Sequence, residues 1–320
     1  MPVLARCPAP YNWAMGNRLI KGFLARRVGM VDSPEISRQA LRRCGIPLAT
    51  PARVVQLSEA QRARAVILVQ DAFTSYFETG LVLDVIELLG RLGFQVLVAP
   101  FKPNGKPLHV HGFLGAFNKA AQGNSAMLKA LADSGLPLVG IDPSMTLTYR
   151  QEYAHALPEA ELPEVLLIQE WLGQHQEVLA QAGAGLPVGN FRLLPHCTEK
   201  TSAAPSIRAW QGVFAALGQT LEVLEVGCCG MSGTYGHESA NYQTSKRIYE
   251  LSWRAPVNDE KNKGKLVATG YSCRSQVKRL DEQRLPHPLQ ALLAQLVEAG
   301  SKGEFIGQGR EPVQPCQSAG

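Results

Sequence analysis

The sequence predicts an α/β protein built from two pseudo-repeated halves with mainly parallel sheets. Its 320 residues, 45% hydrophobic and 18% charged, are enough for a sizeable globular core. Short apolar runs alternate with amphipathic segments of helical period, which is the pattern of α/β folds. The expected strands are 65–69, 95–99, 136–141, 191–194, 221–226 and 265–269. The expected helices are 81–92, 126–134, 207–217, 238–251 and 289–297.

Three segments of the first half recur in the second half at a nearly constant offset. RAVILVQDAFTS (64–75) parallels FRLLPHCTEKTS (191–202), and LPLVGIDPSM (136–145) parallels GKLVATGYSC (264–273). Between them, LLGRLGFQVLVAPFKPNG (88–105) parallels VFAALGQTLEVLEVGCCG (213–230). The offset is 125 positions from Gly93 to Gly218, 126 from Asp71 to Cys197 and 128 from Met145 to Cys273. Such agreement indicates an internal repeat.

The repeat divides the chain into four regions. We expect a helical or linker segment at 1–55, a first half without cysteines at 56–180, a second half with a cysteine site at 181–300 and a flexible tail at 301–320. The tail is assigned on its richness in Gly, Gln and Pro.

Four of the seven cysteines follow expected strands of the second half. Cys197 follows the first strand, Cys228 and Cys229 follow the second, and Cys273 follows the third. The carboxyl ends of parallel strands meet at one edge of a sheet, so we expect these thiols to converge. The matching positions of the first half hold no thiol: Asp71, Pro103, Asn104 and Met145.

Four cysteine thiolates are the usual ligand set for zinc or for an iron–sulfur cluster. In the stretch LEVGCCGMSGTYG (224–236), Gly227 and Gly230 flank the cysteine pair, and we expect both to allow close backbone approach and positive φ. His196 and His237 flank the site and are candidates for hydrogen bonds to it. A thiol redox pair and four unligated buried cysteines remain as alternatives.

Composition and charge exclude several other classes of function. The net charge of +5 is mild, and no run of Lys and Arg interleaved with aromatic residues suggests a nucleic-acid surface. No apolar run reaches the roughly 20 residues of a membrane span. Asn12, Arg18 and Lys21 interrupt the apolar residues near the start, unlike a signal peptide. We therefore expect a cytoplasmic protein.

Several motifs resemble a known domain. LPHCTEKT, VGCCGMSGTYGHE, VATGYSCRSQVKR and RLPHPLQALL resemble the cysteine-rich CCG domain found in heterodisulfide reductases and in anaerobic glycerol-3-phosphate dehydrogenases. Together with YNWAMGN, VQDAFTSYFE, PFKPNGKPLHVHGFL and VGIDPSMTLTYRQEY, they make the chain similar to the C-terminal region of bacterial D-2-hydroxyglutarate dehydrogenases that contain flavin and iron–sulfur centres.

The resemblance implies an iron–sulfur cluster on the four cysteines, with zinc as the alternative. It implies no catalytic residue within this chain, because the FAD would belong to another domain or subunit that also brings a ferredoxin-like module. The chain would relay electrons or complete the substrate cleft; the alternative is a structural or docking module without a redox role. A homo-oligomer stays open.

The chain departs from the family pattern at two points. The family's CxxC pair is here Cys273-Arg274-Ser275-Gln276, so one thiol is missing. The FAD-binding domain and the CxxCxxCxxxCP run expected ahead of this region do not occur in the 320 residues. A four-cysteine cluster, a zinc ion and an empty relic of a site are therefore all compatible with the sequence.

Overall fold

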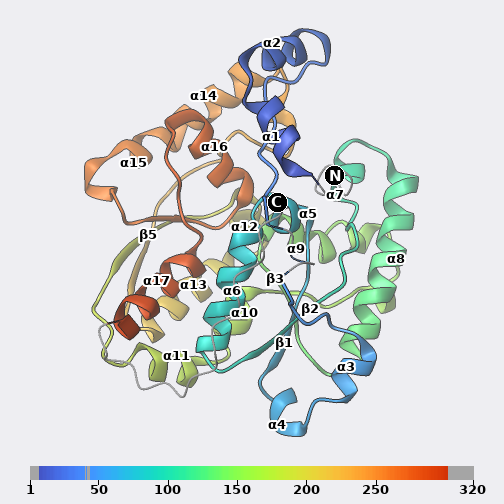
Figure 1. The fold of residues 1–320 in the computed structure, drawn as a ribbon, viewed down its shortest axis with the longest axis vertical. Helices are drawn as coiled ribbons and strands as arrows, with labels where there is room; N and C mark the ends of the chain where they lie inside the picture. The colour runs from blue at the N-terminus through green and yellow to red at the C-terminus, as the bar shows by residue number, and fades with distance from the viewer. Residues whose placement is uncertain (1–6, 40, 42–43, 302–320) are drawn as a thin grey trace.

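The protein is described from a computed structural model that covers residues 7–39, 41 and 44–301 (Figure 1). The predicted α/β class is confirmed, with two parallel sheets. The first sheet has the order β2-β1-β3-β4 and consists of β1 (Ala65–Leu68), β2 (Gln95–Val98), β3 (Leu138–Gly140) and β4 (Leu166–Leu167). The second has the order β6-β5-β7 and consists of β5 (Asn190–Leu194), β6 (Thr220–Val223) and β7 (Leu266–Ala268). The tail expected at 301–320 falls outside the described residues, apart from the first.

The internal repeat is confirmed in strand order, direction and register. Ala65 lies opposite Gln95 in the first sheet, and Asn190 lies opposite Thr220 in the second, so both partners are displaced by 125 positions. The β1–β3 and β5–β7 pairs are parallel as well, on the matching side of the central strand. The first sheet differs only in carrying β4, a strand of two residues that is too short to leave a sequence pattern.

The register corrects one detail of the repeat. Asp71 is the N-cap of α5 (Ala72–Tyr76), and His196 is the N-cap of α12 (Cys197–Ser202). Asp71 therefore corresponds to His196, and the residue that corresponds to Cys197 is Ala72. The alignment of Asp71 with Cys197 was wrong by one position, because the two segments were matched by residue similarity rather than by the helix start.

A shared core lies between the two sheets. It is filled by α6 (Thr79–Arg91), α10 (Ile168–Leu172), α11 (Gln176–Gly183), α13 (Ala204–Ala216) and α17 (Pro288–Ser301). The helices α6 and α17 pack directly on each other; in Figure 1, α6 lies near the middle of the molecule and α17 lies to its left. In β1, Val66 and Leu68 face this core whereas Ala65 and Ile67 face away from it, which is the alternation expected of a strand buried on both faces.

Two further cores cover the outer faces of the sheets. The first sheet is covered by α8 (Leu114–Ala132) and by the single-turn helices Leu147–Tyr149 and Tyr153–His155. The second sheet is covered by α14 (Tyr242–Ser252), α15 (Arg254–Asn258) and α16 (Tyr271–Asp281). Cys229 and Cys273 belong to this last core, so the cysteines lie on the outer side of the second half.

The remaining helices are short or lie near the start of the chain. The described part of the segment 1–55 contains α1 (Pro8–Gly16), α2 (Arg18–Arg27) and α3 (Pro51–Val55), and α4 (Glu59–Arg62) follows it. Other short helices are α7 (Lys106–Val110), α9 (Pro143–Thr146), Glu159–Glu161, Tyr235–His237 and Glu260–Asn262. In the described residues no helix combines the length and apolarity needed to cross a membrane.

Candidate functional site

Cys197 is positioned by the end of β5. The chain leaves β5 at Leu194, and Cys197 is the first residue of α12, where it is partly exposed. The preceding residue, His196, caps this helix: its Nδ1 accepts a hydrogen bond from the Thr198 N–H at 3.1 Å. Since Nδ1 accepts, the proton of the neutral ring lies on Nε2, which is 3.3 Å from Ser272 Oγ.

Cys228 and Cys229 lie in the loop after β6, which turns sharply at Gly230. Gly230 has φ +82°, and a Cβ at this position would lie 2.3 Å from the Ser245 carbonyl oxygen. Only glycine fits such a conformation and such a close approach. The turn directs the Gly230 N–H toward Cys228 Sγ at 3.3 Å. Gly230 thus has the role expected of it.

Gly227 does not need the freedom of a glycine. It is absent from the residues with positive φ, and a Cβ there would make only an ordinary 3.4 Å contact with Ser252 Oγ. The expectation of positive φ at Gly227 was wrong. Its backbone is held by the N–H donating to Ser252 Oγ at 2.8 Å and by the carbonyl accepting from Trp253 Nε1 at 3.0 Å.

Cys273 lies in the first turn of α16, directly after β7. Its side chain is fully buried, and the N-cap of the helix is Gly270. A Cβ on Gly270 would lie 2.2 Å from the His196 ring, so this glycine is what lets the ends of β5 and β7 approach each other. The hydrogen bond from the His196 N–H to Thr269 Oγ1, at 3.0 Å, ties the same two ends together.

The structure brings the four thiols into one series of contacts. The thiols of Cys197 and Cys229 both donate to Cys228 Sγ, and Cys229 also contacts Cys273. The hydrogen bonds from Cys197 and then Cys229 hold the pKa of Cys228 far below its ordinary value, while the same bonds raise the pKa of the two donors. Cys228 is therefore the common hydrogen-bond acceptor of the group. This convergence is the one expected from the strand ends.

The contacts form a chain, not a ring around a common point. Within the described residues, no group of three or more His, Cys, Asp or Glu side chains is arranged to hold a metal ion. Cys197 and Cys228 are partly exposed, and Cys229 and Cys273 are buried. The set thus has the right donor atoms for a soft metal, with two of the four reachable from outside.

The two histidines have different positions. His196 is buried next to the thiols, and burial is the main reason that its pKa is lowered, so the ring stays neutral. His237 instead anchors the N-terminal segment: its Nδ1 lies 2.6 Å from Asp32 Oδ1, and its carbonyl oxygen accepts from Val31 N–H at 2.8 Å. Arg279 completes this group with a 2.7 Å ion pair to Asp32. A contact of His237 with the thiols stays a prediction.

Gln276 stands where the resembled domain has its second cysteine of the CxxC pair. It is fully buried, and its Nε2 donates to Ser245 Oγ at 2.9 Å. Ser245 Oγ in turn donates to the Gly230 carbonyl at 2.7 Å. In place of a thiol, the chain therefore has an amide that supports the turn carrying Cys228 and Cys229.

Sequence reasoning missed a group of buried charged residues between the halves. Glu199 is fully buried and accepts hydrogen bonds from Thr269 Oγ1 at 2.7 Å and from Gln169 Nε2 at 2.8 Å. Burial raises its pKa to about 7. Asp142 Oδ2 accepts the Tyr271 N–H at 2.8 Å, which joins the end of β3 to the equivalent end of β7. Of these residues, only Asp142 could have been found from the sequence, because it directly follows the expected strand 136–141.

Sequence comparison relates the chain to known dehydrogenases. The chain is 52% identical over 297 residues to D-2-hydroxyglutarate dehydrogenase of Pseudomonas putida, and 40% identical over 297 residues to the enzyme of that name from Escherichia coli. These matches cover 92% and 91% of this chain, but only 29% of each relative. The chain thus spans less than a third of the length of these relatives, at their C-terminal part.

A second kind of relative is more distant. One component polypeptide of the anaerobic glycerol-3-phosphate dehydrogenase of Escherichia coli is 28% identical over 254 residues, which are 76% of this chain and 62% of that polypeptide. No protein-family model matches the chain. The resemblance drawn from the cysteine motifs is confirmed: the chain is homologous to the C-terminal part of D-2-hydroxyglutarate dehydrogenases and is related to a CCG-type component of the glycerol-3-phosphate enzyme.

Proposed function

We propose that this chain is the iron–sulfur-binding C-terminal portion of a flavin-linked D-2-hydroxy-acid dehydrogenase with D-2-hydroxyglutarate as substrate. The observation that carries the proposal is the contact series of four thiols at three strand ends, in which Cys228 accepts hydrogen bonds from two of the others. Relatives named D-2-hydroxyglutarate dehydrogenase across 92% of the chain support the substrate.

The chemistry of the four residues suits a cluster. Thiolates are the ligands of iron–sulfur clusters, and the number four is the usual one. Cys197, Cys228, Cys229 and Cys273 are the residues that would hold the cluster. A bound cluster supplies one-electron transfer. The Gly230 N–H already donates to Cys228 Sγ, and such bonds stabilise a thiolate in its charged form.

Oxidation of the hydroxy acid itself needs a partner. A 2-hydroxy acid loses two electrons and its α-hydrogen, and flavins are suited to that reaction. The FAD and a ferredoxin-like iron–sulfur module would belong to the portion of the enzyme that corresponds to the unmatched part of the relatives. That portion would be in the same polypeptide or in a separate subunit. This chain would relay electrons from the flavin or complete the substrate cleft.

Reconstitution tests the cluster. The purified chain is incubated without oxygen with ferrous iron and sulfide, desalted, and analysed for iron, acid-labile sulfide and visible absorption. We expect about four iron atoms per chain for a 4Fe–4S cluster, and loss of the cluster in Cys228→Ser and Cys273→Ser. Cys7→Ser is the matched control, because Cys7 is an exposed free thiol at the N-cap of α1. Iron binding that all three variants retain equally contradicts the proposal.

A zinc-bound or metal-free docking module is the second candidate. It is favoured by Gln276, whose amide supports the turn at Gly230 at the position where the resembled domain has a further thiol. Metal analysis of protein purified without oxygen separates the two. A brown protein containing iron and sulfide supports the cluster, whereas a colourless protein with one zinc or no metal supports the docking module.

A further inference from the structure

The helices α1 and α2, here called the N-terminal helix pair, carry a cluster of exposed apolar side chains. Trp13, Leu19, Phe23 and Val28, the residue that caps α2, are 69%, 84%, 62% and 58% exposed. They are four of the twelve large apolar side chains that are exposed in the described part of the chain, although they lie within 16 successive positions. Exposed apolar side chains that gather in this way mark an interaction surface, whereas singly scattered ones do not.

α2 has more apolar surface than the rest of the fold covers. Ile20 and Leu24 are four positions apart on the helix and are partly buried. Leu19 and Phe23 are also four positions apart, so they too lie on one face, and this second pair is exposed. A surface helix ordinarily has polar residues outside the stripe that packs on its own core. The exposed pair therefore indicates that α2 is also covered from outside.

The helix pair carries positive charge without any negative charge. No Asp or Glu occurs before Asp32, and four cations lie on α2, namely Arg18, Lys21, Arg26 and Arg27. Across the residues that the structure describes, the ion pairs of the N-terminal segment belong to Asp32 and Glu35, and none involves these four cations. Exposed aromatic residues and arginines in the absence of carboxylates are typical of a contact between proteins. The partner that fits has an apolar patch bordered by carboxylates.

The end of α2 is attached to the loop that follows the cysteine pair. Ser239 Oγ donates to the Ala25 carbonyl at 2.9 Å, and the Ser239 N–H donates to the Gly29 carbonyl at 2.7 Å. Ser239 follows Cys229 by ten positions (239 − 229). A partner bound to α2 is therefore connected through these hydrogen bonds to the segment that carries Cys229.

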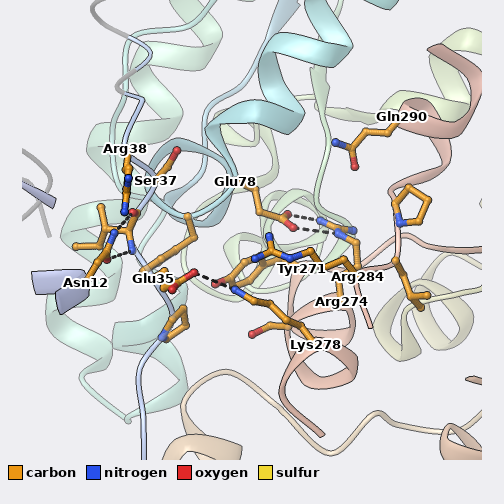
Figure 2. Close-up of a pocket in the computed structure, with 16 residues that line it drawn as sticks. Asn12, Glu35, Ser37, Arg38, Glu78, Tyr271, Arg274, Lys278, Arg284 and Gln290 are labelled. Atoms are coloured by element: carbon orange, nitrogen blue, oxygen red, sulfur yellow. Dashed lines mark hydrogen bonds and ion pairs between the residues drawn. The ribbon is translucent and has the colours of Figure 1, made fainter. Parts of the chain in front are cut away.

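Further contacts attach α1 and the segment after α2. Asn12 exchanges two 2.8 Å hydrogen bonds with the backbone of Ile36. Glu35 pairs with Lys278 of α16 at 3.0 Å, and Figure 2 shows this pair at the pocket between the N-terminal segment and α16. In Figure 1 the helix pair lies at the upper end of the molecule, with α2 outermost. The exposed apolar face thus belongs to an anchored element at the end of the molecule.

The lengths of the relatives indicate what covers this face. The dehydrogenases of Pseudomonas putida and Escherichia coli match this chain over 29% of their length, at their C-terminal part. Most of the length of these relatives therefore precedes the matched part. In an enzyme of that organisation the larger portion comes before α1 in the polypeptide, so the exposed face lies beside the place where the two portions meet.

We propose that the exposed apolar face of α1 and α2 is the docking surface for the flavin-containing portion of the dehydrogenase. That portion would present an apolar patch bordered by carboxylates to Trp13, Leu19 and Phe23. The inference rests on the proposed function for the identity of the partner, and it adds the surface on which the partner binds. Docking there brings the partner to the segment that continues from Cys229, which suits the transfer of electrons between the two portions.

Hydroxyl-radical footprinting of a chimeric dehydrogenase tests the surface. In the chimera the full chain replaces the matched C-terminal part of the Pseudomonas putida enzyme. We expect Trp13, Leu19 and Phe23 to be oxidised at least about fivefold more slowly in the chimera than in the isolated chain, because the centre of an interface excludes water. Leu251 is the matched control, a leucine of α14 that is 83% exposed and should be oxidised equally in both. Equal oxidation of Leu19 in the two proteins would overturn the proposal.

Charged variants assign the protection to the apolar face. Leu19→Glu and Leu251→Glu change leucines of nearly equal exposure, so neither should shift the urea midpoint of the isolated chain. In the chimera, Leu19→Glu should return the oxidation of Trp13 to its rate in the isolated chain, because a carboxylate is not buried against an apolar patch. Leu251→Glu should leave Trp13 protected. Protection of Trp13 that both variants retain would contradict the proposal.

Hydrogen exchange in the natural Pseudomonas putida dehydrogenase makes the same comparison without an engineered junction. After correction for sequence, the amides that align with α2 should exchange at least about tenfold more slowly than those of α2 in the isolated chain. Amides that align with α13, a helix of the shared core, should exchange alike in both proteins. Equally fast exchange at α2 would overturn the docking surface even where the chimera does not fold.

Two other occupants are distinguished with the isolated chain. We expect a monomer in light scattering and no flotation with vesicles of phosphatidylcholine and phosphatidylserine. A dimer that Leu19→Glu dissociates would assign the face to a second copy, and flotation that Leu19→Glu abolishes would assign it to a membrane surface; either result overturns the proposal. None of these measurements needs a cluster or turnover. Failure of the docking surface is thus distinguished from failure of the cluster, which the iron and sulfide analysis reports.

Discussion

The guanidinium of Arg274 forms an ion pair with the carboxylate of Glu78, across the junction between the two halves of the molecule. The Arg274 side chain is only 5% exposed, and its Nη1 also donates to the carbonyls of Ala268 and Thr269 at 2.8 and 2.7 Å. Burial disfavours the charged guanidinium, but Glu78 more than compensates, so the pKa of Arg274 is raised. One residue thus joins the end of β7 to the start of α6.

Removing the carboxylate of Glu78 should destabilise the fold. Glu78→Gln leaves a buried guanidinium without its counter-charge, and we expect a loss of about 2 kcal/mol in the free energy of unfolding. Glu87→Gln is the matched control, because Glu87 pairs with Arg91 on the exposed face of α6; it should cost less than about 0.5 kcal/mol. Urea unfolding of both variants is the measurement. Equal losses would show that the junction does not depend on this pair.

The turn at Gly230 gives a second prediction. Gly230→Ala introduces both a strained positive φ and a clash with the Ser245 carbonyl, so we expect a loss of about 3 kcal/mol and a lower cluster content after reconstitution. Gly233→Ala separates the two causes: Gly233 has φ +63° but nothing within 4 Å of its added Cβ. It should cost about 1 kcal/mol and leave the cluster intact. A Gly230→Ala protein as stable as Gly233→Ala would contradict the role given to the turn.

Asp71 makes stability depend on pH. It caps α5 through the N–H groups of Phe73 and Thr74 at 2.7 and 3.0 Å. Burial, and next the charge of Asp142, raise its pKa from 3.8 to about 7. Between these two values the folded protein holds a proton that the unfolded chain has released. The contribution of Asp71 to stability is therefore complete below about pH 3.8 and is lost as the pH rises to about 7.

Asp71→Asn removes this dependence while keeping an oxygen for the cap. Relative to the unmodified protein, we expect the variant to gain about 2 to 4 kcal/mol in unfolding free energy at pH 8 compared with pH 5. The control is Asp133→Asn, which alters an exposed carboxylate at the end of α8 and should show no such gain. Urea unfolding at the two pH values is the test. Parallel behaviour of both variants would contradict the assignment to Asp71.

Much of the fold was predictable because the second half of the chain repeats the pattern of the first half. The repeat predicted the three strands of each half. In the structure, the two strand pairs β1–β2 and β5–β6 have the same register, displaced by 125 positions. Helix bounds were less accurate: α8 begins at Leu114, twelve residues before the expected start, because polar and glycine residues weaken its apolar pattern. The helix α14 begins at Tyr242 and not at the expected residue 238, because Tyr235–His237 form a separate single-turn helix ahead of it.

The site was predictable in its cysteines but not in its supporting contacts. The carboxyl ends of parallel strands had to place Cys197, Cys228 and Cys273 at one edge. The hydrogen bonds of Gln276 to Ser245, and of Asp142 to Tyr271, depend on how separate layers pack, which no local period encodes. For the same reason the pairing of His237 with Asp32, 205 positions apart, was not foreseen.

The last prediction is that the isolated chain does not oxidise any 2-hydroxy acid. Its sequence has no GxGxxG fingerprint after a strand that would hold a dinucleotide, and cysteine-bound clusters move single electrons, whereas the reaction removes two electrons and a hydrogen. The purified chain is assayed with D-2-hydroxyglutarate, D-lactate and glycolate and an artificial acceptor, with and without added FAD. The full-length Pseudomonas putida dehydrogenase serves as the positive control. Turnover by the isolated chain would require a hydride acceptor within it and would overturn the assignment of the chemistry to a flavin partner.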